Sequence, residues 1–277
     1  MKKSPLVSII MGVYNNAPTL PAALDSILAQ TYENWEFVIC DDCSTDGSPS
    51  ILESYAARDA RFVLLRNEKN LRLAASLNRC LEVTKGELIA RMDGDDIALP
   101  ERFAVQVSYL QEHPEMDLVG TAMQRFSDEG LADIQYGYAY PDRFSLRSEV
   151  PFSHATIMTY KKVFDALGGY AVLPRTARAE DMDLWARFFH AGFSGTNLPD
   201  ALYLVREDES AIQRRTFRSR WQAYQTIKAG HRLLGYPKSW TFRTLVVTLA
   251  KGFTPFWVQK KYRDQQKKRF LEKEGEA

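Results

Sequence analysis

The sequence is poor in cysteine and has no long apolar run, and each shortage excludes a class of protein. It holds only three cysteines in 277 residues, an odd and sparse set that is typical of a reducing compartment rather than of a disulfide-stapled secreted domain. Cys40 and Cys43 form a C-x-x-C pair, but no second pair accompanies it, so we expect neither a zinc site nor a redox centre there. No stretch reaches the roughly 18 apolar residues that a membrane-spanning helix needs.

Other absences narrow the range of functions further. The apolar run 6–14 is short, lacks a small-residue cleavage site and runs into two asparagines, so we expect a buried first strand rather than a signal peptide. No G-x-G-x-x-G motif follows an early strand, which disfavours a dinucleotide-binding oxidoreductase. Internal repeats and low-complexity segments are also missing from the sequence. These features predict an ordinary globular protein of the cytoplasm.

Charge is unevenly distributed along the chain. The net charge is only +1, yet residues 1–205 carry 19 lysines and arginines against 28 acids, whereas residues 206–277 carry 17 against 7. Such a split indicates an acidic globular body followed by a basic segment with a partner of its own. We therefore predict one domain over residues 1–210 and a basic, aromatic-rich helical extension over residues 211–277.

Strand and helix patterns alternate through the first half and become less regular in the second. The expected strands are 7–13, 36–40, 62–65, 88–92, 118–126, 155–160 and 201–205. The expected helices are 21–30, 48–57, 74–83, 100–112, 162–167 and 181–191, then 212–234, 240–250 and 256–270. The early strands are apolar throughout rather than alternating, which is typical of a parallel sheet with both faces covered. The fold class is therefore α/β, with a mostly parallel sheet flanked by helices.

Polar side chains follow three of these strands. Tyr14, the pair Asp41–Asp42 and the cluster Asp93–Asp96 all come directly after an expected strand, where ligands bind in open α/β sheets. Clustered carboxylates repel one another and stay ionised only with a cation nearby. A few oxygen ligands suit Mg²⁺ or Mn²⁺ bridging to a substrate diphosphate. Within the cluster we expect Asp96 to cap the following segment rather than to bind the metal.

Four motifs stand out along the chain: Val7–Asn15, Asp41–Gly47, Met92–Asp96 and Glu180–Trp185. In their order and spacing they resemble the motifs of the family 2 glycosyltransferases, which are inverting enzymes with the Rossmann-like GT-A fold. The resemblance covers about residues 5–210, and it implies sugar transfer from a nucleotide sugar in the biosynthesis of a bacterial glycan. It also implies a bound Mg²⁺ or Mn²⁺.

We expect a nucleotide site with four contributors, of which Arg72 is inferred from its position alone, because many relatives carry a glycine in its region. Asp42 would accept the N3–H of uracil, a proton that cytosine lacks, and Tyr14 would stack on the base. The alternative for Asp42 is a turn residue, because the segment that follows it is rich in turn formers. Arg72 lies just before an expected helix, where it would reach the nucleotide or a phosphate oxygen, or else form a surface ion pair. Asp93 would contact the ribose.

The chemical step would use residues from two motifs. By the resemblance, Asp95 ligates the metal and Asp181 is the general base that takes the proton of the acceptor hydroxyl, a role that typically contributes ~10²–10⁴-fold in rate. Glu180 is a weaker candidate for orienting the acceptor. His154 is either an acceptor contact or a structural histidine, and Asp183 is expected to be structural.

One departure from the family pattern concerns the metal. Relatives often end the domain with an aromatic-Arg-x-His sequence whose histidine completes the metal shell, whereas here Asp208 stands in place of that histidine. The ligand at this position would be a carboxylate, a water molecule or nothing. Metal dependence is therefore open at this point.

The basic extension favours an acceptor at a membrane. Aromatic residues are interleaved with its lysines and arginines, as in helices that lie on an anionic membrane surface. A helical packing arm is the alternative, and no nucleic-acid recognition motif accompanies the charge. We predict a UDP-sugar donor, a saccharide or lipid-linked saccharide acceptor, peripheral contact with the cytoplasmic face of the inner membrane, and no nucleic-acid partner.

Two other functions fit the same scaffold. A sugar-phosphate nucleotidyltransferase would need a glycine-rich, arginine-containing loop after the first strand, and the sequence 13–18 is not such a loop. A non-catalytic protein that binds a nucleotide sugar would have no need for Asp95 and Asp181 together, although the missing histidine favours it slightly.

Overall fold

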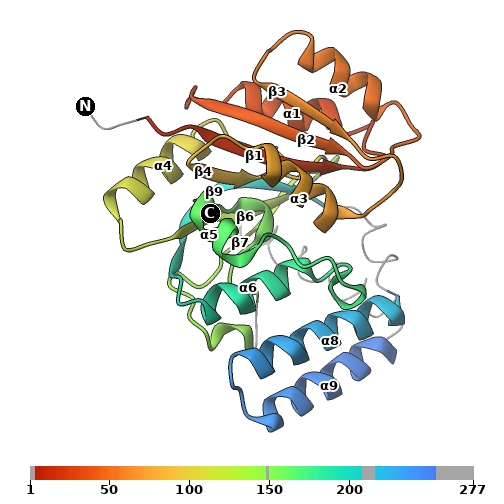
Figure 1. The fold of residues 1–277 in the computed structure, drawn as a ribbon, viewed down its shortest axis with the longest axis vertical. Helices are drawn as coiled ribbons and strands as arrows, with labels where there is room; N and C mark the ends of the chain where they lie inside the picture. Colours follow the sequence, from red (N-terminus) through yellow and green to blue (C-terminus); the bar gives the residue numbers. More distant parts are fainter. Residues whose placement is uncertain (1–3, 148–149, 208–215, 254–277) are drawn as a thin grey trace.

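The first half of the chain alternates strands and helices as the sequence predicts (Figure 1). The computed structural model describes residues 4–147, 150–207 and 216–253. In this half the elements are β1 Val7–Val13, α1 Leu20–Leu28, β2 Trp35–Asp41, α2 Ser48–Ala56, β3 Phe62–Arg66, α3 Leu73–Val83, β4 Leu88–Arg91, β5 Ile97–Ala98 and α4 Arg102–Glu112. The short strand β5 was not expected from the sequence.

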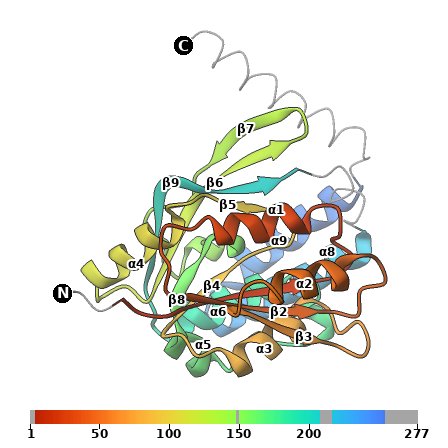
Figure 2. The same cartoon turned by 90° about the horizontal axis from the view of Figure 1, so that it is seen from above.

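The second half departs further from the expectation. Its elements are β6 Leu118–Ser127, β7 Gly130–Gln135, η1 Ser145–Arg147, η2 His154–Thr156, β8 Met158–Tyr160, α5 Lys161–Leu167, η3 Pro174–Thr176, α6 Glu180–His190, β9 Gly195–Arg206, α8 Phe217–Leu233 and α9 Lys238–Phe253. Strand β7, which the sequence did not predict, pairs with β6 in a hairpin that projects from the body (Figure 2). Strand β8 is shorter than expected because the 3₁₀ turn η2 precedes it.

One sheet runs through the structure in the order β3-β2-β1-β4-β8-β6-β9-β5, with β7 beside β6. Strands β3, β2, β1 and β4 are parallel neighbours, whereas β8 is antiparallel to β4 and β6. The parallel register pairs Val13 with Asp41 and Ile10 with Arg91. The residues that follow β1, β2 and β4 therefore emerge at one edge of the sheet.

Both faces of the sheet are covered, as continuous apolar strands require. Alternate residues of β1 and β2 contribute to two separate buried clusters. One cluster contains side chains of α1, α2 and α4, and the other contains side chains of α3, α5 and α6. The predicted α/β class is thereby confirmed, with the parallel half of the sheet at the centre of the core.

The helices after β9 lie against the body. Helix α8 contacts α6 and α9 (Figure 1), and a Cβ added to Gly230 would lie 2.9 Å from the Cβ of Ala186. Leu234 and Tyr236 join the same buried cluster as Trp185. The predicted boundary at 210 and the predicted helix 256–270 lie outside the described residues. Among the described helices, none combines the length and apolarity that crossing a membrane requires.

Candidate active site

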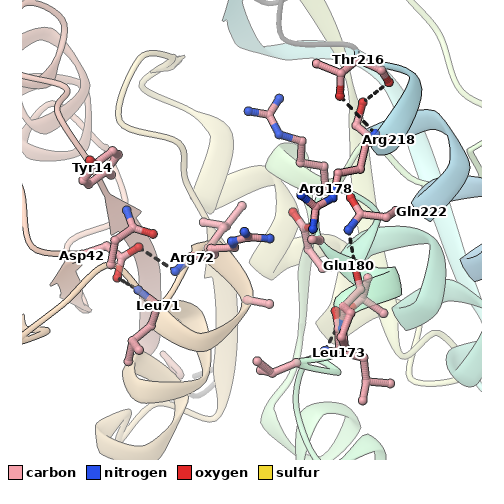
Figure 3. Close-up of a pocket in the computed structure, with 18 residues that line it drawn as sticks. Tyr14, Asp42, Leu71, Arg72, Leu173, Arg178, Glu180, Thr216, Arg218 and Gln222 are labelled. Atoms are coloured by element: carbon pink, nitrogen blue, oxygen red, sulfur yellow. Dashed lines mark hydrogen bonds between the residues drawn. The ribbon is translucent and has the colours of Figure 1, made fainter.

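A cavity of about 770 Å³ opens at the edge of the sheet where the parallel strands end (Figure 3). One wall holds Tyr14 after β1, Asp42 after β2 and Arg72 before α3. The opposite wall holds Arg178 and Glu180 at the start of α6, together with the first turns of α8. Three of the predicted nucleotide residues therefore share one cavity.

The buried carboxylate of Asp42 holds the loop before α3 in place. Its Oδ1 accepts from the backbone N–H of Leu71 over 2.7 Å and from Asn67 Nδ2 over 2.6 Å, and its Oδ2 accepts from the N–H of Arg72 over 2.8 Å. A carboxylate has about four lone-pair sites, so Asp42 retains acceptor capacity at the cavity wall. Asn67 was not among the predicted residues, because nothing in the sequence marks it as the partner of Asp42.

Backbone strain is concentrated at this cavity. In the described chain, the non-glycine residues with positive φ are Asn15 (54°), Cys43 (63°), Arg72 (72°) and Arg178 (64°). Two of them line the cavity, and the other two directly follow Tyr14 and Asp42. Arg72 combines its positive φ with a ψ of 166°, a region that is essentially restricted to glycine. Each such conformation costs about 1–3 kcal/mol and is typical of a functional site.

Three carboxylates gather after β4. Oxygen atoms of Asp93, Asp95 and Asp96 all lie within 4.8 Å of one another. Asp96 is buried and accepts from the N–H of Arg206 in β9 over 2.8 Å. Burial, followed by the charges of Asp93 and Asp95, raises the pKa of Asp96 well above its usual range. A hard divalent cation would relieve this repulsion, so the oxygen set fits Mg²⁺ or Mn²⁺.

The prediction that Asp96 caps the following segment is wrong. The residues after it form β5, which pairs with β9, so the Asp96 carboxylate turns toward the backbone of β9 instead. The turn is also tied to α1, because Thr19 Oγ1 donates to the carbonyl of Gly94 over 2.9 Å. Thr19 is also the N-cap residue of α1, but its side chain makes no capping hydrogen bond to that helix.

Arg91 is a functional candidate that the sequence analysis missed. Its side chain is 6% exposed, and its guanidinium binds both carboxylate oxygens of Asp93, with 2.6 Å between Nη1 and Oδ2. The signal was present in the sequence as a single charge inside the apolar run 88–92. Asp93 therefore contacts the buried guanidinium of Arg91 and also lies beside the carboxylates of Asp95 and Asp96.

The two acids at the start of α6 lie within the electrostatic field of Arg91. Burial, and then the charge of Asp181, raises the pKa of Glu180, whereas Arg91 lowers it. The pKa of Asp181 is also raised, mainly by burial, against the opposing effects of Arg91 and of the N–H of Met182, which donates to it over 2.8 Å. A carboxylate with a raised pKa is better suited to accept a proton near neutral pH.

Two further predicted residues have structural contacts. Asp183 pairs with Arg175 over 3.0 Å and with Arg187 over 2.7 Å, which confirms that it is structural. His154 Nε2 lies 2.7 Å from the Tyr170 hydroxyl, and its ring packs edge-on against Trp185.

His154 is not part of the cavity wall. Burial, followed by the charge of Arg91, lowers the pKa of His154 well below the ordinary histidine value, which favours the neutral ring. These contacts favour the structural alternative for this histidine. Asp208, which replaces the histidine of the family pattern, lies outside the described residues.

Comparisons with known proteins agree with this geometry. The sequence model of glycosyl transferase family 2 matches residues 8–180. EpsE of Bacillus subtilis (strain 168), which carries the name of a glycosyltransferase without a stated substrate, is 42% identical over 277 residues, covering 99% of this chain and 98% of its own. WfaP of Escherichia coli, named a UDP-Glc:α-D-GlcNAc-diphosphoundecaprenol β-1,3-glucosyltransferase, is 28% identical over 202 residues, covering 72% of this chain and 77% of its own.

Among solved structures, residues 1–349 of S. aureus TarS in complex with UDP share the fold. The TM-score is 0.68 at 18% sequence identity, and the match covers 90% of this chain and 72% of that one. The GT-A fold that the four motifs imply is thereby confirmed.

Proposed function

The chain belongs to glycosyl transferase family 2, and we propose that it transfers a sugar from a UDP-sugar to an acceptor hydroxyl with inversion at the anomeric carbon. The observation that carries this proposal is the convergence of separate sequence motifs at one edge of the sheet. One cavity is lined by Tyr14, Asp42, Arg72 and Glu180. The buried Arg91 interacts with two further predicted residues: it forms an ion pair with Asp93, and its charge opposes the rise in the pKa of Asp181.

The donor base would lie against Tyr14 and Asp42. Tyr14 is 48% exposed and lines the cavity, so its ring is accessible for stacking. Asp42 retains acceptor capacity for the N3–H of uracil beyond its three protein donors. The complex of TarS with UDP, on the same fold, supports a uridine nucleotide for this chain as well. Arg72 would contact a phosphate oxygen, and Asp93 the ribose.

The aspartate cluster would hold the metal. Asp95, with Asp93 beside it, would ligate Mg²⁺ or Mn²⁺, which when bound would neutralise charge on the departing diphosphate. Arg91 holds Asp93 in position through its two hydrogen bonds. The protein thus supplies a preorganised carboxylate set at the end of β4.

Asp181 would act as the general base. It would remove the proton of the acceptor hydroxyl as that oxygen bonds to the anomeric carbon and the bond to the UDP oxygen breaks, so that UDP leaves with the electron pair. The raised pKa of Asp181 favours this proton transfer, and the charge of the buried Arg91 opposes part of that rise. Glu180 would orient the acceptor.

The acceptor is proposed to be a lipid-linked saccharide in bacterial polysaccharide biosynthesis. The name of WfaP specifies such an acceptor for that relative. In this chain, α8 and α9 expose Phe217, Trp221 and Phe242 among basic side chains. Such surfaces bind anionic membranes, which would place the enzyme on the cytoplasmic face of the inner membrane.

A two-stage assay tests this function. Thermal melting with UDP-glucose, UDP-GlcNAc and GDP-mannose, each with and without Mn²⁺, should show stabilisation by a UDP-sugar, because a ligand at 100 times its Kd adds about 2.7 kcal/mol. The stabilising donor is then offered with a GlcNAc-diphospholipid acceptor. Sugar transfer by the wild-type chain and its loss in Asp181→Asn support the proposal. Sugar transfer that persists in Asp181→Asn would show that Asp181 is not the general base.

The same assay separates the two alternative functions. Pyrophosphate release from UTP and a sugar phosphate would indicate a nucleotidyltransferase. Binding of the donor without turnover with any lipid-linked or free saccharide would indicate a binding protein.

A further inference from the structure

The wall of the cavity that faces Tyr14 and Asp42 is built by residues that the nucleotide site does not use. Arg178 and Glu180 contribute to it from the start of α6. Helix α8 contributes Arg218, Ser219 and Gln222, together with its N-cap residue Thr216. Figure 3 shows Arg178 and Arg218 on the side of the cavity opposite Asp42, with Arg72 between them and Asp42. The first turns of the basic extension are therefore part of the substrate cavity.

This wall is fixed to the segment that precedes the proposed base. Gln222 Nε2 donates to the carbonyl of Pro174 over 2.8 Å, and Thr226 Oγ1 donates to the carbonyl of Arg175 over 2.6 Å. Farther along the helix, Gly230 allows α8 to approach Ala186 of α6 closely. Helix α8 thus holds its first turns over the cavity through direct contacts with η3 and α6.

The cavity carries an excess of positive charge. Arg72, Arg178 and Arg218 line it, against the carboxylates of Asp42 and Glu180. Asp42 already accepts three hydrogen bonds from the protein, and burial beside Asp181 raises the pKa of Glu180. In the parts of the chain that the structure describes, neither Arg72 nor Arg218 forms an ion pair. An anionic ligand is the natural complement of this surface.

We propose that Arg178 and Arg218, with the polar first turns of α8, form a second phosphate subsite that binds the diphosphate linking an acceptor saccharide to its lipid, separately from the aspartate cluster. The inference rests on the proposed function, which assigns the diphosphate of the UDP-sugar to the metal held by Asp95 and so leaves the diphosphate of the lipid-linked acceptor for this subsite. Asp93, Asp95 and Asp96 do not line this cavity, so the arginines form a distinct site.

Arginine is suited to this task. Its planar guanidinium binds phosphate oxygens through two parallel hydrogen bonds, which gives directional as well as electrostatic recognition. Ser219 and Gln222 add neutral donors on the same side of the cavity. A lipid diphosphate seated there would have its saccharide near Glu180, at the start of the helix that carries Asp181.

Isothermal titration of the full chain tests the subsite with two probes. Farnesyl diphosphate is titrated in EDTA, so that the aspartate cluster holds no cation, with farnesol as the control for its lipid. UDP is titrated separately with Mn²⁺. The variants are Arg178→Gln/Arg218→Gln and, as a matched control in the last turn of α8, Arg232→Gln, which lies outside the cavity wall. Melting temperatures verify that each variant is folded.

If the subsite takes the acceptor, farnesyl diphosphate binds the wild-type chain and Arg232→Gln but at least about tenfold more weakly to the double variant, while UDP affinity is unchanged. A fall of similar size in UDP affinity, seen in the double variant only, would place the donor diphosphate at these arginines and overturn the assignment to the acceptor. Equal binding of both probes to wild type and double variant overturns the inference. Failure of the proposed function is a different result: the wild-type chain would not bind UDP, or Tyr14→Ala would bind it equally well.

Discussion

Arg91 and Asp93 form a bidentate ion pair at the end of β4, with 2.6 Å between Nη1 and Oδ2. The Arg91 side chain is 6% exposed and that of Asp93 is 29% exposed, so the pair lies at the boundary between the core and the surface. The charge of the same guanidinium opposes the rise that burial causes in the pKa values of Glu180 and Asp181. One buried arginine therefore connects the proposed metal site with the proposed base.

Arg91→Met should destabilise the chain. Removing one member of a buried pair leaves the other charge uncompensated, which typically costs 3–5 kcal/mol, and we expect about 3 kcal/mol because Asp93 is partly exposed. Urea unfolding measures this loss. The control is Arg91→Met/Asp93→Asn, which should recover part of the lost stability because no unpaired charge remains. A double variant no more stable than Arg91→Met would contradict the role assigned to the pair.

At position 72, replacing arginine by glycine should stabilise the fold and weaken the binding of UDP. Its φ of 72° and ψ of 166° are strained for any residue with a Cβ. Arg72→Gly removes the strain and should raise the free energy of unfolding by about 1 kcal/mol, after the entropic cost of glycine. Arg72→Ala retains the strain and should bring no such gain.

Both Arg72 variants should bind UDP more weakly than the wild-type chain, because both lack the guanidinium. Thermal melting and UDP titration of the two variants separate the effects of backbone and side chain. Equal melting temperatures for the glycine and alanine variants would show that the strain is not relieved by glycine.

The sequence predicted the site residues whose positions follow from the order of the strands. It did not predict the residues that come together only through packing between distant helices. Tyr14, Asp42 and Asp93 were located because each follows a buried strand, and parallel strands end at one edge of the sheet. Arg178 and Arg218 were missed because they meet only when α8 folds back onto α6, a contact that depends on Gly230 against Ala186. The prediction for Asp96 was wrong because β5, which follows it, is only two residues long. Its pairing with β9 is not visible as a pattern in the local sequence.

Asp181→Asn should reduce kcat by ~10²–10⁴-fold, the usual contribution of a positioned base. UDP affinity should be unchanged, because Asp181 would act on the acceptor. In the wild-type chain, kcat should fall on the acid side at a higher pH than an ordinary aspartate would give, since burial raises the pKa of Asp181 above 3.8. Steady-state kinetics over a pH series measure both effects, and an unchanged kcat would exclude this base.

The same substitution should stabilise the fold at neutral pH. Because the pKa of Asp181 is raised in the folded chain, its protonated form contributes stability below pH 3.8, and that stability is lost as pH rises through the folded-state pKa. The side chain of asparagine does not ionise, so the variant does not lose this stability as the pH rises. Asp181→Asn should therefore melt above the wild type at pH 7, with the difference shrinking as the pH falls toward 4.

Asp183→Asn is the matched control for this stability effect. It weakens ion pairs with Arg175 and Arg187, so it should melt below the wild-type chain at pH 7. An Asp181→Asn variant that also melts below the wild type at pH 7 would mean that the Asp181 carboxylate stabilises the fold rather than destabilising it.

Titration of UDP against four forms of the chain, with and without Mn²⁺, tests the central claim most directly. The wild type and Asp181→Asn should bind UDP with equal affinity and more tightly when Mn²⁺ is present. Asp42→Asn should bind UDP weakly in both conditions, and Asp95→Asn should lose the gain from Mn²⁺. Equal UDP affinity in all four forms, or a gain from Mn²⁺ that survives in Asp95→Asn, would contradict the account.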